Sequence, residues 1–241
     1  MSRDTITVSE VFGPTVQGEG AVIGKPTVFV RTGGCDYRCV WCDSKYAVLP
    51  EYRGEWRRMS PGEVFWEVQD LSGGRPILVT LSGGNPALQP LSGLIDLGRE
   101  GGYTFAVETQ GTVAPGWFRD LDYLTLSPKP PSSGMGTDWA KLERCLEAAG
   151  EGTSTVFKVV VFDDADYGYA REVAARYPGV PMYLQVGNDE PPGPGVEPEP
   201  DVGRLLGRYE WLVEKVLADG WNEVTVLPQL HVLLWGNKRA V

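Results

Sequence analysis

Three cysteines close together in the sequence are the residues best suited to chemistry. Cys35, Cys39 and Cys42 lie within eight residues in the spacing C-x3-C-x2-C. Thiolates at this spacing can converge on one soft metal centre. A structural zinc site or an ordinary iron–sulfur cluster would take a fourth ligand, but Cys145 and the single histidine, His231, are distant in sequence. Three cysteines alone would leave one iron of a 4Fe-4S cluster open to a ligand from outside the chain.

The fourth cysteine, Cys145, follows a different pattern. Leu142, Cys145, Leu146 and Ala149 recur at i, i+3, i+4 and i+7, which is the apolar stripe of a helix. A free cysteine in such a stripe behaves as a small buried hydrophobe. We therefore expect Cys145 to take no part in the metal site.

Short runs rich in β-branched and aromatic residues alternate with helical patterns along the chain. They mostly lack clean alternation, as strands of a buried parallel sheet do. We expect strands over Thr27–Arg31, Ile77–Leu81, Tyr103–Val107, Tyr123–Leu126, Thr155–Phe162 and Met182–Val186. Cap and stop signals place helices from Ser60 to about Leu71, over Leu91–Arg99, from Asp138 to Gly150, and over Ala165–Arg176 and Asp201–Leu217.

Six units of strand followed by helix predict an α/β fold whose parallel sheet curves as a partial barrel. A flat doubly wound sheet is the alternative, and the pattern alone does not separate the two. In either fold the active site should lie at the carboxyl ends of the strands. The cysteine loop follows the strand that ends at Arg31, which agrees with this placement.

Composition excludes several classes of protein. The chain has 241 residues, of which 42% are hydrophobic, enough for a sizeable core. A net charge of −10 argues against binding nucleic acid through its phosphates. No apolar run is long enough for a membrane span, and no signal peptide is visible, so we expect a cytoplasmic protein. We expect one domain over residues 1–241, with an N-terminal extension over about residues 1–26 and a Pro-rich surface loop over about residues 187–203.

The cysteine spacing, with Trp41 just before the last cysteine, resembles that of the radical S-adenosylmethionine (SAM) superfamily. In that superfamily the amino and carboxylate groups of SAM chelate the open iron. An electron from the cluster then breaks the sulfonium C–S bond and produces a 5′-deoxyadenosyl radical. The resemblance implies a 4Fe-4S cluster held by Cys35, Cys39 and Cys42, with no other catalytic group than this cluster and the radical derived from SAM.

Further segments, in order along almost the whole chain, resemble the 7-carboxy-7-deazaguanine synthase family. They are Phe12–Gly20, Phe29–Arg31, Gly33–Cys35, Cys42–Ser44, Ser82–Pro86, Glu108–Gly111, Ser127–Lys129, Phe157–Lys158 and Pro228–Lys238. The resemblance implies a lyase that converts 6-carboxy-5,6,7,8-tetrahydropterin to 7-carboxy-7-deazaguanine and ammonia, on the route to queuosine. It also implies a shortened, modified (β/α)6 partial barrel, Mg2+, regeneration of SAM, a homodimer and a flavodoxin-like electron donor.

The resemblance also assigns roles to individual residues. The pterin substrate would be bound by Val16, Gln17, Gly18, Arg31, Ser82 and Pro228. SAM would be bound by Gly84, Glu108, Ser127, Pro128 and Lys129. These roles suit the residue types, because a glutamine amide both donates and accepts hydrogen bonds and an arginine can pair bidentately with a carboxylate.

Three positions need separate comment. Family members usually carry a threonine where this chain has Ser44. The resemblance implies that the Ser44 hydroxyl binds Mg2+, with Asp43 nearby. Without the family, Ser44 would be interpreted as a turn cap. Asn85 stands where the superfamily usually has a glutamate that contacts the methionine end of SAM, which puts that contact in doubt. The leucine spacing around His231 predicts a packed helical turn, so we expect a structural role for this histidine.

Two other functions remain open from the sequence. A glycyl-radical activase of the same superfamily would share the cysteines and glycines but would consume SAM and act on a protein. A non-catalytic iron–sulfur or zinc module would share only the cysteines and would not cleave SAM.

Overall fold

One nine-stranded sheet organises the computed structural model, which describes residues 4–188, 191 and 199–241. The strand order is β3-β1-β2-β4-β5-β6-β7-β8-β9. Parallel pairing joins β2 (Pro26–Thr32), β4 (Leu78–Gly83), β5 (Thr104–Thr109), β6 (Tyr123–Leu126), β7 (Ser154–Val161), β8 (Met182–Val186) and β9 (Val224–Leu227). At one edge, β1 (Ile6–Val16) and β3 (Arg57–Met59) add antiparallel strands.

The six predicted strands are confirmed as β2, β4, β5, β6, β7 and β8, with ends that differ by at most two residues. The patterns do not predict β1, β3 or β9. Strands β3 and β9 are the two edge strands of the sheet and have only three and four residues. Strand β1 contains Gly13 and Pro14, residues that usually mark a turn, and its register on β2 shifts at that point.

The predicted helices are also confirmed, because their caps form as the sequence indicates. They are α2 (Pro61–Leu71), α3 (Ser92–Glu100), α4 (Trp139–Ala148), α5 (Asp164–Arg176) and α6 (Val202–Ala218). Ser60 and Glu63 form a capping box on α2, and Asp138 caps α4. Shorter helical turns are α1 (Lys45–Val48), α7 (Leu230–Trp235), η1 (Gly20–Val22), η2 (Pro50–Glu55), η3 (Pro86–Leu88), η4 (Gly116–Asp120) and η5 (Pro131–Ser133). No helix in the described part of the chain is both long and apolar enough to cross a membrane.

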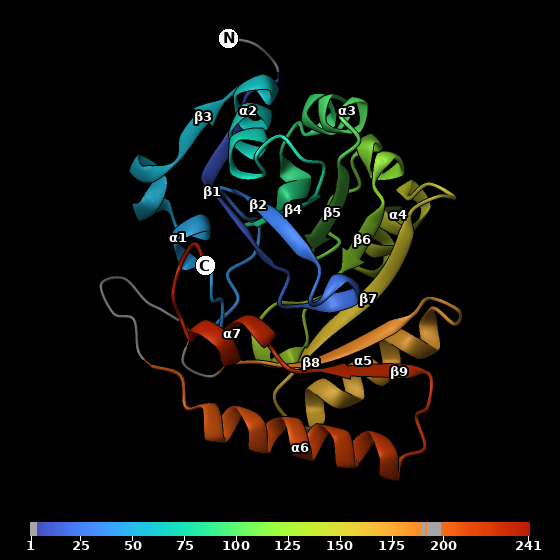
Figure 1. The fold of residues 1–241 in the computed structure, drawn as a ribbon. Coiled ribbons are helices and arrows are strands. Elements are labelled where there is room, and N and C mark those ends of the chain that lie inside the picture. Colours follow the sequence, from blue (N-terminus) through green and yellow to red (C-terminus); the bar gives the residue numbers. More distant parts are fainter. Residues whose placement is uncertain (1–3, 189–190, 192–198) are drawn as a thin grey trace.

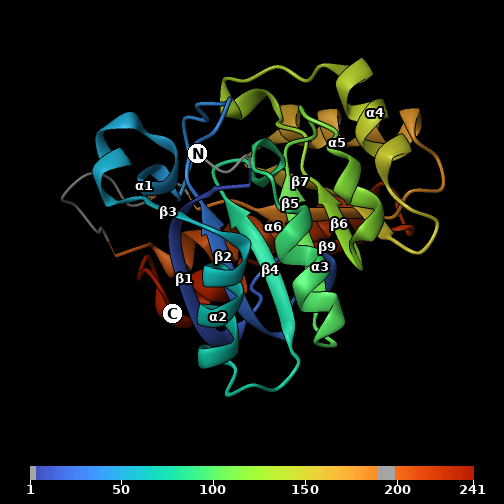
Figure 2. The same ribbon diagram turned by 90° about the horizontal axis from the view of Figure 1, so that it is seen from above.

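The two faces of the parallel sheet have different neighbours. Along β7, the side chains of Phe157, Val159 and Val161 belong to the hydrophobic core, whereas those of Lys158 and Val160 line a cavity. Helices α2 to α6 lie outside the strands, and the strands curve around the opposite face (Figures 1 and 2). A flat doubly wound sheet would carry helices on both faces. The arrangement is that of the expected curved α/β sheet.

Segments from the two ends of the chain meet at the cavity. Helix α7 docks on the loop after β1, where the backbone N–H of Leu230 donates to the carbonyl of Gly18 over 3.1 Å. Figure 1 shows α7 close to the ends of β2 and β8. A Cβ at Gly18 would overlap the side chain of His231, so this close approach requires glycine.

Candidate active site

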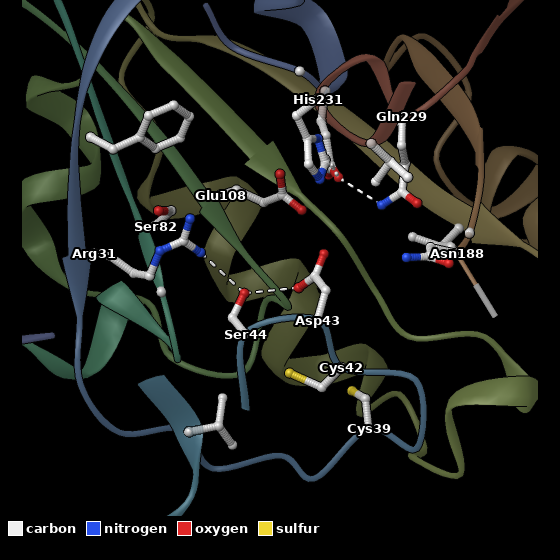
Figure 3. Close-up of a pocket in the computed structure, with 18 of the residues that line it drawn as sticks. Arg31, Cys39, Cys42, Asp43, Ser44, Ser82, Glu108, Asn188, Gln229 and His231 are labelled. Carbon is white, nitrogen blue, oxygen red and sulfur yellow. Dashed lines mark hydrogen bonds and ion pairs between the residues drawn. The ribbon is translucent and has the colours of Figure 1, made fainter. Parts of the chain in front are cut away.

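A cavity of about 240 Å³ opens at the carboxyl ends of the parallel strands. Its wall includes the cysteine loop and residues from β2, β4, β5 and β7, together with the loops after β1 and β8 and the C-terminal residues from Gln229 onwards. Figure 3 shows Arg31 and Ser82 on one side, Gln229 and Asn188 on the other, and the sulfur atoms of Cys39 and Cys42 below them. The predicted location of the active site is therefore where the structure has its cavity.

Cys35, Cys39 and Cys42 all line this cavity, and none forms a disulfide. The Sγ of Cys35 accepts hydrogen bonds from the backbone N–H of Tyr37 at 3.4 Å and from Nε2 of Gln110 at 3.6 Å. Hydrogen bonds of this kind are used to tune the sulfur ligands of iron–sulfur clusters. By contrast, Cys145 is 0% exposed within the hydrophobic core, as predicted.

Burial dominates the electrostatics of the three thiols. Burial raises the pKa of Cys35 and of Cys39, and burial together with the Asp43 carboxylate raises the pKa of Cys42 to about 12. Thiols with such pKa values remain protonated at neutral pH unless a metal takes the place of the proton. Three thiols on one loop that line the same cavity match the donor set for three ligands of a 4Fe-4S cluster.

The end of β4 packs directly on the cysteine loop. The backbone N–H of Gly84 donates to Thr32, and a Cβ at Gly84 would overlap the carbonyl group of Gly34. Only glycine allows the two backbones to come this close. The Gly83–Gly84 pair thus brings the end of a strand beside the cysteines, and both glycines line the cavity.

Arg31 presents a fixed positive charge to one side of the cavity. Its Nε lies 2.8 Å from Oε1 of Glu10, and its Nη1 donates to Oγ of Ser44 over 3.1 Å. The guanidinium also lies 5.5 Å from the ring centroid of Phe12 and 5.6 Å from that of Tyr46. Burial lowers the pKa of Arg31, but the phenol of Tyr46 and the Glu10 carboxylate outweigh it and raise the pKa above its usual value. Arg31 can therefore hold an anionic group of a ligand.

Oxygen ligands gather beside Arg31. Oγ of Ser44 donates to Oδ1 of Asp43 over 2.8 Å. Ligand atoms of Asp43, Glu19 and His231 lie within 4.8 Å of one another. Carboxylate and hydroxyl oxygens are ligands that Mg2+ accepts, usually together with waters and oxygens of the substrate. The arrangement supplies a place where a divalent cation could bind.

A buried lysine holds two of the carboxylates that line the cavity. Lys158 is 1% exposed, pairs with Glu19, and lies 2.5 Å from Oε1 of Glu108. Burial raises the pKa of Glu19, but the charge of Lys158 and hydrogen bonds from Lys158 and Gln229 outweigh it, so the pKa lies well below its usual value. Burial lowers the pKa of Lys158, but the two carboxylates outweigh burial, so this pKa lies above its usual value. The lysine and Glu19 are therefore charged at neutral pH.

Most of the predicted ligand-binding residues meet at the cavity. Val16, Gln17, Gly18, Arg31, Ser44, Ser82, Gly84, Glu108 and Lys129 all line it. Ser127 and Pro128 are buried and are not part of the lining, and Ser127 instead accepts a hydrogen bond from Lys129 Nζ over 3.1 Å. Pro228 is also outside the lining, whereas the next residue, Gln229, is part of it.

Several lining residues are not predicted by the sequence patterns. Glu19 and Lys158 line the cavity and lie in segments that carry the family resemblance. The signal that could have identified Lys158 is a lysine inside an apolar strand. Asn188 falls in the region expected to be a solvated loop, yet it is 8% exposed and lines the cavity. Its position two residues after the end of β8 is the signal. His231 also lines the cavity, with Nδ1 3.8 Å from Glu19, although its helical turn packs as expected. Most of the remaining predicted Pro-rich loop, residues 189–190 and 192–198, lies outside the described residues.

A curved parallel sheet with three cysteines on the loop after its first parallel strand defines the radical SAM class of proteins. The family model described as "Radical SAM superfamily" matches residues 29–127, which include this loop, the second half of β2 and strands β3 to β6. The crystal structure of QueE from Escherichia coli superposes with a TM-score of 0.64, covering 94% of this chain and 95% of that one at 22% identity. The expected fold is thereby confirmed.

Comparison with individual proteins is more specific. The chain is 49% identical to 7-carboxy-7-deazaguanine synthase of Bacillus subtilis, covering 98% of both chains. It is 44% identical to the protein of that name from Bacillus cereus, covering 98% of this chain and 99% of the other. The chain belongs to the 7-carboxy-7-deazaguanine synthase family. Neither alternative function suggested by the cysteines is favoured by these relatives.

The cavity cysteines and the core cysteine should differ in iron binding. We expect Cys35→Ala, Cys39→Ala and Cys42→Ala each to lose most iron and cluster absorbance after anaerobic reconstitution, because each removes one of three thiolate ligands. Cys145→Ala should retain both, since its thiol lies in the core. Circular dichroism would check that all four variants fold. Loss of the cluster in a folded Cys145→Ala protein would contradict the assignment.

The buried lysine should be important for stability in a pH-dependent way. Lys158→Met leaves the Glu19 and Glu108 carboxylates without their cation, and we expect a loss of about 3–5 kcal/mol of unfolding free energy at pH 7. The contribution of the depressed Glu19 pKa is present in full above the unfolded pKa of 4.5 and is lost progressively as pH falls from there through the lower folded pKa. In the variant the buried carboxylates have no cation, so they take up protons more readily as pH falls and their cost decreases. The difference between parent and variant in urea unfolding should therefore shrink from pH 7 to pH 4.

Lys215→Met provides the matched control, because Lys215 forms a more exposed pair with Asp164 at 2.6 Å. A much smaller loss of stability is expected there. An equal loss in the two variants, or a deficit in Lys158→Met that does not change with pH, would contradict the role of the buried network.

Proposed function

We propose that this chain converts 6-carboxy-5,6,7,8-tetrahydropterin to 7-carboxy-7-deazaguanine and ammonia, as a lyase on the route to queuosine. The observation that carries the proposal is the loop of three cavity cysteines in a chain that is 49% identical, over almost its full length, to a protein of that name. The cavity is also lined by the Arg31 guanidinium, which suits a substrate carboxylate, and by the Glu19 and Glu108 side chains, which suit N–H donors of a pterin ring.

Cys35, Cys39 and Cys42 would hold the 4Fe-4S cluster, and Gly84, Glu108 and Lys129 line the space beside it that SAM would occupy. When bound, the cluster and SAM supply a radical that removes a hydrogen atom from C6 of the substrate and receives it back after ring contraction. Loss of ammonia then balances the atoms without net oxidation, so SAM can be regenerated.

The substrate carboxylate would pair with Arg31, whose orientation is fixed by Glu10 before any ligand binds. A guanidinium held in place by a carboxylate binds with less loss of side-chain entropy. Gln17 and the buried Ser82 hydroxyl, which has no hydrogen-bond partner within the described chain, remain to bind polar groups of the pterin.

Mg2+ would bind at Ser44, with Asp43 holding a coordinated water. The Ser44–Asp43 hydrogen bond and the nearby Glu19 carboxylate support this placement. The ion would orient the pterin through its carboxylate and ring carbonyl oxygens, and would stabilise negative charge that develops during ring contraction. We also propose that the protein acts as a homodimer that receives electrons from a flavodoxin-like protein.

Product analysis after anaerobic reconstitution tests the proposed function. With dithionite, SAM, Mg2+ and 6-carboxytetrahydropterin, the parent should form 7-carboxy-7-deazaguanine, while 5′-deoxyadenosine should stay far below the amount of product. Cys39→Ala is the matched control and should form neither. A reconstituted parent that cleaves SAM but leaves the pterin unchanged would overturn the proposal, and equal amounts of 5′-deoxyadenosine and product would show that SAM is consumed.

Ser44 should determine the response to magnesium. We expect Ser44→Ala to keep its cluster content and SAM binding but to lose Mg2+ stimulation of turnover, because the hydroxyl ligand is gone. Ser44→Thr keeps the oxygen and should retain the stimulation. Rates measured over a Mg2+ titration would decide the question, and a parent-like response in Ser44→Ala would show that Ser44 is not the ligand.

A further inference from the structure

The amide of Asn85 is fully used inside the protein. Asn85 is 0% exposed and does not line the cavity. Its Nδ2 donates to Oδ1 of Asp36 over 2.9 Å and to Oγ1 of Thr112 over 3.1 Å. Its Oδ1 accepts from Oγ1 of Thr109 at 2.8 Å and from the backbone N–H of Ala87 at 3.2 Å. Two donated and two accepted bonds exhaust the capacity of a primary amide, so this side chain has no group left for a ligand.

One of these bonds, from Nδ2 to Asp36, reaches the cysteine loop, while the bonds with Thr109 and Thr112 reach the end of β5. Asp36 directly follows Cys35, and its Oδ1 also accepts from Nε2 of Gln110 at 2.5 Å. The backbone N–H of Asn85 donates to the carbonyl of Gly34 over 2.8 Å. Asn85 therefore holds the residue before Cys35 through its backbone and the residue after Cys35 through its side chain.

We infer that Asn85 is a positioning residue for the cluster: it fastens the first cysteine to the ends of β4 and β5 instead of contacting SAM. This inference rests on the proposed function only in taking the three cysteines to hold a 4Fe-4S cluster. It also accounts for the departure from the superfamily glutamate at this position.

The chemistry of the pair explains why residue 85 must be an amide. Asp36 is an exposed carboxylate on a loop, and without a donor at position 85 one of its two amide contacts is lost. A carboxylate at position 85, which is buried, would supply no N–H and would place a negative charge beside the Asp36 carboxylate without a matching donor. The acid and the amide are complementary, so exchanging them between the two positions should preserve the contact.

This exchange defines the experiment, with Asn85→Asp, Asp36→Asn and the double variant N85D/D36N. After anaerobic reconstitution, Asn85→Asp should release iron to a chelator about tenfold faster than the parent, because its carboxylate faces Asp36. Asp36→Asn keeps an oxygen that can accept from Asn85 and should stay within about twofold of the parent. The double variant should return to within about threefold of the parent, since the amide introduced at position 36 can donate to the carboxylate introduced at position 85.

A second measurement separates positioning from contact with SAM. SAM affinity, measured per reduced cluster from the change in its EPR spectrum, should stay within about twofold of the parent in the double variant. Parent-like iron release in Asn85→Asp, or failure of the double variant to recover although circular dichroism shows that it folds, would overturn the inference. So would weakened SAM binding in a double variant with a normal cluster.

The outcomes for the proposed function are distinct. A parent that holds its cluster and responds to the exchange, but forms no 7-carboxy-7-deazaguanine, would refute the proposed reaction and leave the role of Asn85 intact. If the parent forms product but Asn85→Asp keeps its cluster, the proposed reaction stands and the role of Asn85 is refuted.

Discussion

The cysteine loop and the end of β4 meet backbone to backbone, and the rest of the site depends on this contact. Gly84 lies so close to Gly34 that any side chain at position 84 would overlap the Gly34 carbonyl. Parallel strands bring their carboxyl ends to one edge of the sheet, so a loop packed against β4 is also next to the end of β5. The contact thus brings the three thiols to the cavity that Glu108 also lines, with Gln110 donating to Cys35, and the amide of Asn85 hydrogen-bonds to Asp36 of the loop.

Two sets of ion pairs hold the charges at the cavity, one around Arg31 and one around Lys158. Arg31 is balanced by Glu10, which does not line the cavity, so the guanidinium faces the cavity while its partner lies behind it. Lys158 is balanced by Glu19 and Glu108, which do line the cavity. Burying such groups costs desolvation energy that the ion pairs offset only in part. In return, positive and negative charges are held in place before a ligand enters, which favours a ligand with a matching distribution of charge.

Neither end of the chain could form the site alone. Gln229 donates to Glu19 over 3.0 Å across 210 positions of sequence, and Leu230 donates to Gly18. These two hydrogen bonds join the loop after β1 to the start of α7, so each segment holds the other in place. The two segments form one wall of the cavity, and that wall carries part of the polar surface expected to bind the pterin.

The sequence by itself determined the elements that depend on neighbouring residues. Apolar runs placed six parallel strands, capping residues such as Ser60 and Asp138 placed the helices, and the cysteine spacing singled out the loop whose three thiols line the cavity. The sequence does not predict the edge strands β3 and β9, because three or four residues are too few to show a periodic pattern. Only the tertiary structure decided which distant side chains meet: Lys158 with Glu19 across 139 positions, Asn85 with Asp36 across 49, and Asn188 with the cavity. Local periodicity and capping are encoded within a few residues, whereas these contacts arise only when the sheet has curved and its strand ends have come together.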